Sequence, residues 1–83
     1  MSNKIGENVS VKFLFNTTNA SSPQAVTWNN RLYTIDKIGL HYTVYKGTTL
    51  YHLFAVTSNY TYLLLSLNTK TLNWTLEEIG EYT

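Results

Sequence analysis

The sequence predicts an all-β domain, a small antiparallel meander whose strands curl into a barrel. Most of residues 9–79 consists of short segments, rich in Thr, Tyr and Val, in which apolar and polar side chains alternate. Alternation with a period of two is typical of half-buried strands. Asn, Gly and Ser separate these segments, and no long stretch has the period of an amphipathic helix. Each strand is therefore expected to turn back at once onto its neighbour.

The length of the chain limits it to one domain. A chain of 83 residues has room for a single core. We expect one domain over residues 1–83, with an ordered core over residues 8–79 and frayed termini. The sequence contains no cysteine, so apolar side chains must stabilise the fold without disulfides. Apolar residues make up 43% of the chain and aromatic residues 14%, which is enough for a small barrel.

Three strands are expected in the first half of the chain, over residues 9–15, 24–28 and 31–38. The first should bury one face, formed by Val9, Val11, Phe13 and Phe15. Residues 16–23 are polar and end in Pro23, which cannot donate to a sheet ladder, so this stretch is expected to be a loop. Asn29 and Asn30 separate the next two strands. Asn tolerates positive φ angles, so the pair predicts a tight hairpin turn.

Four more strands are expected over residues 40–46, 50–57, 60–67 and 72–79. Gly39 should break or kink the chain before the first of them, and turns are expected at residues 46–48, 58–59 and 68–71. Alternation places Leu40, Tyr42 and Val44 on one face, and Leu72, Trp74 and Leu76 on one face. A final helical turn over residues 76–81 is the alternative for the C-terminus. At this size the strands should form an SH3-like barrel or, alternatively, an OB-like barrel.

The charge of the chain argues against a strongly basic nucleic-acid module. Net charge is +1, and only 13% of residues are charged, about half of the usual fraction. A surface that relies on neutral polar groups resists association poorly, so self-association is expected.

Groups that could carry out catalysis are scarce. The carboxylates are Glu7, Asp36, Glu77, Glu78 and Glu81. Glu77 and Glu78 are adjacent on a predicted strand, so they should point to opposite faces. His41 and His52 are the only histidines, and they should approach each other if their strands pair around the turn at residues 46–48. Two imidazoles make a poor zinc site. We therefore expect no enzyme activity, no metal site and no cofactor, and a half-buried structural position for His52.

Aromatic residues provide the remaining functional signal. Trp28, Trp74, Phe13, Phe15 and Phe54 are expected in the core. Tyr45, Tyr51 and Tyr60 are expected to be at least partly exposed, where tyrosine can anchor a protein interface or stack on bases. The candidate binding residues are these three tyrosines with Arg31, Lys37 and Lys46. High β propensity alone also accounts for many tyrosines in strands.

The N-terminal residues lack the apolar core of a secretory signal, and no apolar run is long enough to span a bilayer. The expected location is therefore the cytoplasm, with no membrane partner. Five N-x-S/T triplets, which begin at Asn8, Asn16, Asn19, Asn59 and Asn73, leave open a secreted or surface module.

Residues 23–79 resemble a small bacterial family of uncharacterised all-β domains. The family pattern is a Pro before a W-x-G-R-x-Y-x-V hairpin, a strand with Trp or Tyr, an apolar hairpin and a final W-x-L strand. The matching residues are Pro23, Trp28, Asn30, Arg31, Tyr33, Ile35, Tyr42, Phe54, Val56, Leu65, Trp74 and Leu76, with Asn30 at the position of the Gly. The resemblance implies an SH3-like barrel. Because some members occur beside bacterial translesion DNA polymerases, it also implies an accessory role in DNA transactions.

Together these observations predict a non-enzymatic interaction module that binds a protein partner or itself, through an edge strand or through a face that carries Tyr45, Tyr51 and Tyr60. The alternative is a weak nucleic-acid-binding accessory domain in DNA replication or repair, which would use the same tyrosines with Arg31, Lys37 and Lys46.

Overall fold

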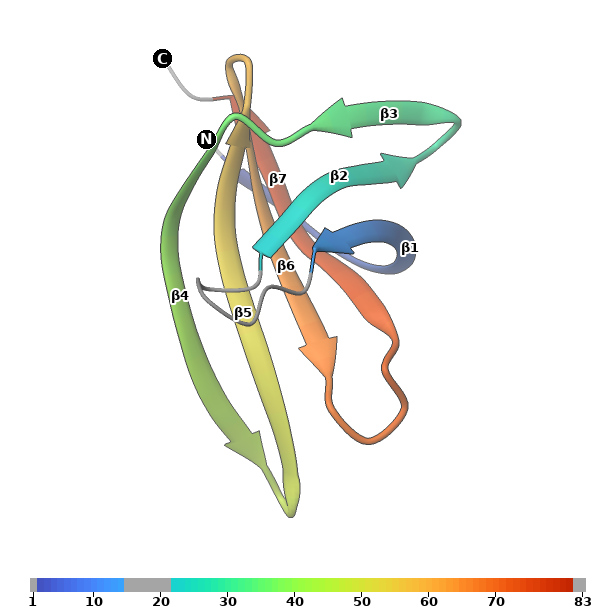
Figure 1. The fold of residues 1–83 in the computed structure, drawn as a ribbon, viewed down its shortest axis with the longest axis vertical. Coiled ribbons are helices and arrows are strands. Elements are labelled where there is room, and N and C mark those ends of the chain that lie inside the picture. Colours follow the sequence, from blue (N-terminus) through green and yellow to red (C-terminus); the bar gives the residue numbers. More distant parts are fainter. Residues whose placement is uncertain (1, 15–21, 82–83) are drawn as a thin grey trace.

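The computed structural model describes residues 2–14 and 22–81 of the chain. The described residues form seven strands and no helix. Their bounds are β1 (Ser2–Leu14), β2 (Ser22–Trp28), β3 (Arg31–Thr34), β4 (Lys37–Lys46), β5 (Thr49–Ser58), β6 (Thr61–Asn68) and β7 (Trp74–Glu81). All pairings are antiparallel, and the single sheet curls into a half-barrel in which β2 and β3 cross over the longer strands (Figure 1). The predicted all-β fold is confirmed.

The strand order, β3-β2-β1-β7-β6-β5-β4, joins two meanders through the first strand. Residues of β1 up to Val9 pair with β7, and residues from Ser10 onward pair with β2. Gly6 has a φ of 70° within the irregular stretch of the β1–β7 pairing, a conformation that glycine adopts without a steric penalty. Next to this irregular stretch, the Trp28 indole Nε1 donates to Glu7 Oε1 at 3.0 Å. One strand thus serves both halves of the sheet.

The core lies between the long strands β4 to β7 and a flap, which we define as β2, β3 and the part of β1 that pairs with β2. Its buried residues are Val26, Tyr33, Phe54, Val56, Leu63, Leu65 and Leu76. Val9, Val11 and Phe13 pack against this core from β1 and confirm the predicted buried face. Trp28 and Trp74 also pack against it, and the rings of Phe13, Phe54 and Trp74 lie within 6 Å of one another by centroid distance.

Tight turns connect most neighbouring strands. Asn29 and Asn30 adopt φ angles of 52° and 60° and confirm the predicted hairpin. Gly47, with a φ of 63°, lies in the turn between β4 and β5 as expected. The β5–β6 turn lies one residue later than predicted, at Asn59 and Tyr60, with Asn59 at a φ of 55°. These turns need a positive φ, and Asn or Gly supplies it in each case.

The predicted strand over residues 31–38 was wrong, because the chain changes partners in its middle. The amide of Ile35 donates to the Gln24 carbonyl at 2.9 Å, whereas the amide of Asp36 donates to the Thr57 carbonyl at 2.8 Å. The chain therefore leaves β2 and joins β5 between these two residues, which separates β3 from β4. Gly39 does not break the chain before a strand, since it is the extra residue in a register shift inside β4. A bulge of this kind bends its strand, which agrees with the alternative of a kink.

Other predicted boundaries also change. Strand pairing begins at Ser2 and ends at Glu81, beyond the expected core of residues 8–79. Pro23 lies in β2 rather than in a loop, beside a register shift that accommodates its missing amide hydrogen. Leu72 lies in the β6–β7 loop at a φ of 63°, so it does not share a strand face with Trp74. The helical alternative for residues 76–81 was wrong, because β7 covers them. The predictions for Phe15 and for residues 16–21 lie outside the described residues.

Candidate binding surface

The long strands have an outer face, on the side opposite the core, that is largely apolar. The register places Leu40 beside Ala55, Ala55 beside Leu64, and Tyr42 beside Leu53. We define the outer face by Leu40, Tyr42, Val44, Tyr51, Leu53, Ala55, Tyr62 and Leu64. These side chains are half-buried or exposed, and Leu40 retains 55% of its surface. Because the flap packs on the inner face, no described element covers the outer face.

Strand β4 lies at one edge of the sheet and borders the outer face. It is ten residues long and pairs only with β5 along the described sheet. Nine of its ten residues are exposed, and it has no Asp, Glu, Lys or Arg between Lys37 and Lys46. The opposite edge, β3, has only four residues. Long edges without charged residues are the ones available for pairing with another strand.

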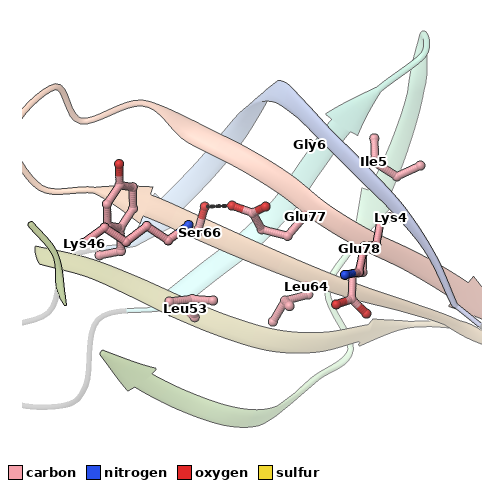
Figure 2. Close-up of a pocket in the computed structure, with 10 residues that line it drawn as sticks. Lys4, Ile5, Gly6, Lys46, Leu53, Leu64, Ser66, Glu77 and Glu78 are labelled. Atoms are coloured by element: carbon pink, nitrogen blue, oxygen red, sulfur yellow. Dashed lines mark hydrogen bonds between the residues drawn. The ribbon is translucent and has the colours of Figure 1, made fainter. Parts of the chain in front are cut away.

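A hollow of about 420 Å³ opens on the outer face between β4 and β1. Leu53 and Leu64 line its apolar part, and Ser66, Glu77 and Glu78 line an acidic part (Figure 2). Lys4 and Lys46 also line the hollow, and Lys4 lies directly opposite Glu78 in the strand register. The hollow therefore combines an apolar floor with charges of both signs.

The prediction that Glu77 and Glu78 point to opposite faces was wrong. Leu65 pairs with Leu76, but Leu64 pairs with Glu78, so Glu77 is an additional residue in a β-bulge. A bulge interrupts the two-residue alternation of a strand. Both carboxylates consequently line the same hollow, where the Ser66 hydroxyl donates to Glu77 Oε2 at 2.6 Å.

The outer face is partly desolvated even though it is uncovered. Burial raises the pKa of the Tyr62 phenol above its ordinary value, and the negative charge of Glu78 adds to this increase. Tyr42 contributes in the same direction. These three side chains are therefore close enough to influence one another on the outer face.

The six predicted binding residues do not form one surface. Lys37 and Lys46 begin and end β4, which places them about 30 Å apart along an extended strand. Arg31 begins β3, where its guanidinium lies 5.4 Å from the centre of the Tyr33 ring. Tyr60 lies in the β5–β6 turn and is 78% exposed.

The pairing of Tyr45 with Leu50 and of Val44 with Tyr51 places the two candidate tyrosines of this hairpin on opposite faces. A common face for Tyr45 and Tyr51 is therefore not formed, although both are at least partly exposed as predicted. Only Tyr51 and Lys46 come together, with the ammonium 5.2 Å from the ring centre. Both line the hollow.

The two histidines meet on the inner face, on the same side of the sheet as Phe54. His41 Nε2 and His52 Nδ1 are 2.8 Å apart, which confirms that the pair approaches across the sheet. The His41 ring stacks on Phe54, with centroids 4.2 Å apart and planes 8° apart. Burial, followed by the nearby charge of His52, lowers the pKa of His41. His52 is half-buried as predicted.

Sequence reasoning missed most of the hollow, namely Lys4, Leu53, Leu64, Ser66, Glu77 and Glu78. No local signal marks the bulge that turns Glu77 toward the hollow. Within the described ranges, no group of three or more His, Cys, Asp or Glu side chains could hold a metal ion. The arrangement is suited to binding through backbone edges and apolar contacts.

Comparison of the chain with protein-family models, with curated proteins and with solved structures finds no match. Among residues 2–14 and 22–81, no helix is long and apolar enough to cross a membrane.

Proposed function

We propose that this protein is a non-catalytic association module that pairs its edge strand β4 with a strand of a partner protein, and that a second copy of the chain is such a partner. The observation that carries the proposal is the ten-residue edge of β4, which has no charged side chain between its two terminal lysines. Strand addition of this kind takes its affinity from backbone hydrogen bonds and its specificity from alternate side chains.

Self-pairing of β4 agrees with the symmetry of common dimers. Two copies of an antiparallel edge can pair about a two-fold axis perpendicular to the sheet. That arrangement places both outer faces on the same side of one continuous sheet. Leu40, Tyr42 and Val44 of each copy then become neighbours across the new pairing, and their exposed apolar surface is reduced.

The nucleic-acid alternative receives less support from the arrangement of charge. Arg31, Lys37 and Lys46 lie in three separate places, whereas phosphate binding needs several cations along one track. Glu77 and Glu78 also line the hollow next to the outer face.

The test is the molar mass in solution of the untagged protein over a range of concentrations, together with two matched threonine substitutions. Thr43 and Thr34 are both exposed residues of edge strands, in β4 and β3. We expect the wild-type chain and Thr34→Lys to dimerise with equal affinity. Thr43→Lys should weaken dimerisation at least about tenfold, because it places like charges on both sides of the seam.

The mass measurement can also contradict the proposal. A wild-type chain that remains monomeric up to millimolar concentration would overturn pairing with a second copy. A dimer that both lysine variants weaken equally would show that β4 is not the seam. Circular dichroism of each variant checks that the fold is retained.

A further inference from the structure

The pairing of β4 with β5 brings the two histidines of the chain into direct contact. The register sets Thr43 opposite His52 and His41 opposite Phe54, so the two imidazoles are diagonal neighbours on the inner face. Nε2 of His41 and Nδ1 of His52 face each other at 2.8 Å. In the neutral pair, one nitrogen donates a hydrogen bond and the other accepts it.

We propose that His41 and His52 form a chelating site for Cu²⁺ or Ni²⁺, in which the ion binds the two facing ring nitrogens. The ring that donates in the neutral pair then carries its proton on its other nitrogen, so both facing nitrogens offer a lone pair to the ion. A metal–imidazole bond is about 2.0 Å long. Two such bonds at a right angle place their nitrogens about 2.8 Å apart, whereas the tetrahedral angle places them about 3.3 Å apart. The observed separation of 2.8 Å matches the right angle. The two nitrogens therefore need not move apart, but each ring must turn so that its lone pair points at an ion beside the line that joins them.

The donor set also favours these ions over zinc. Structural zinc sites use four protein ligands in a tetrahedron, but the described part of the chain provides no third His, Cys, Asp or Glu beside this pair. Square-planar and tetragonal sites of nitrogen and oxygen donors are typical of Cu²⁺ and Ni²⁺. Water can occupy the positions that the two imidazoles leave open.

Contacts with neighbouring residues and strands fix the positions of the two histidines. The His41 ring is stacked on Phe54, whose own ring packs against Trp74 in the core cluster. His52 lies on β5, which has a strand on each side.

The site shares strand β4 with the association edge, because His41 belongs to that strand, but the two proposals use different groups. Metal binding uses the imidazole nitrogens of His41 and His52, whereas strand pairing uses backbone amides and carbonyls. A wild-type protein that fails to bind a metal ion can therefore still dimerise through β4, and the reverse also holds. The two proposals are tested by different measurements.

The experiment titrates untagged protein with CuCl₂, NiCl₂ and ZnCl₂ at pH 7.5 and follows quenching of tryptophan fluorescence, because Trp74 lies next to Phe54 in the same ring cluster. Electron paramagnetic resonance of the Cu²⁺ complex reports the bound nitrogens. The variants are His41→Asn, His52→Asn and the double substitution, which removes every histidine from the chain. The double variant gives the baseline for binding at the terminal amine.

We expect Cu²⁺ to bind most tightly and each single substitution to weaken binding at least about tenfold, which is the cost known for loss of a supporting residue alone. The nitrogen splitting should change from two imidazoles to one in either single variant. Equal affinities for the wild type and the double variant would overturn the site. If a variant fails to fold, a wild-type spectrum without imidazole nitrogen splitting overturns it instead.

Discussion

The two faces of strands β5 and β6 are made of similar residues but have different environments. On the inner face, Phe54, Val56, Leu63 and Leu65 are buried in the core. On the outer face, Leu53, Ala55 and Leu64 are only half-buried, and no described element covers them. Leu63, Leu64 and Leu65 are consecutive in the sequence, yet the middle one faces away from the core. Apolar character alone therefore does not separate the core from a surface available for binding.

The comparison separates stability from recognition. The inner face holds the sheet to the flap, so its residues determine whether the chain folds. The outer face contributes less to folding because its side chains remain partly hydrated. Apolar side chains that contribute little to the free energy of folding, and that lie beside an unpaired strand edge, are the ones available to a partner.

Truncation of neighbouring leucines should give the largest contrast. Leu65→Ala should lower the free energy of unfolding by about 2–5 kcal/mol, because Leu65 is fully buried and a cavity remains. Leu64→Ala should cost about 1 kcal/mol or less, because Leu64 is half-buried on the open face. Urea denaturation of both variants at low protein concentration measures the difference.

A similar loss for both leucine variants would show that the outer face is covered in solution. Repeating the measurement at high protein concentration then distinguishes covering by a second copy from covering within the chain, since only the former depends on concentration.

The bulge in β7 gives a smaller test on the outer face. Ser66 is 3% exposed, and its hydroxyl donates to the Glu77 carboxylate. Ser66→Ala should lower the free energy of unfolding by about 1–2 kcal/mol, because a carboxylate loses a charge-assisted hydrogen bond. In Glu77→Gln the side-chain oxygen still accepts, so this variant should lose less. Thermal denaturation of the two single variants and the double variant measures the coupling, and additive losses would contradict the bond.

The smallest effect concerns the pH dependence of stability at Tyr62. Its pKa is raised in the folded state, so the unfolded chain loses the phenolic proton first as the pH rises. The free energy of unfolding should therefore fall from about pH 10, the ordinary value for tyrosine, up to the folded-state pKa. Tyr62→Phe should lose less stability over this window. Urea midpoints at pH 8 and above pH 10 measure the difference between the two proteins, and parallel changes would contradict the prediction.

Local chemistry determined how well the sequence predicted the strands. The turn at Asn29 and Asn30 was predictable because few residues adopt a positive φ. The division of residues 31–38 into β3 and β4 was not, because it depends on the amide of Asp36 pairing with distant Thr57. Leu72 was placed in a strand because it continues an apolar alternation, although its backbone adopts a loop conformation.

The candidate surface was less predictable than the fold. The meeting of His41 and His52 followed from one hairpin and its turn, so the sequence was sufficient. The hollow needs the bulge at Glu77 and also the pairing of β1 with β7, which joins residues that are 65 to 78 positions apart (Val9 with Trp74, Ser2 with Gly80). The prediction that Tyr45 and Tyr51 share a face was wrong, because the register of the hairpin, and not its composition, decides which side of the sheet each residue faces.

The pairing of the first strand with the last has a consequence for the order of assembly. Strands β4 to β7 can pair in sequence through short connections, but Ser2 must find Gly80. Closing a loop that spans nearly the entire chain is entropically costly, and contacts of this range slow folding. On the ribosome, the N-terminal part of β1 has no partner until β7 has emerged. The N-terminal part of β1 is therefore synthesised before the other strands but is among the last parts to be incorporated, and until then the edge of β7 is open to other chains.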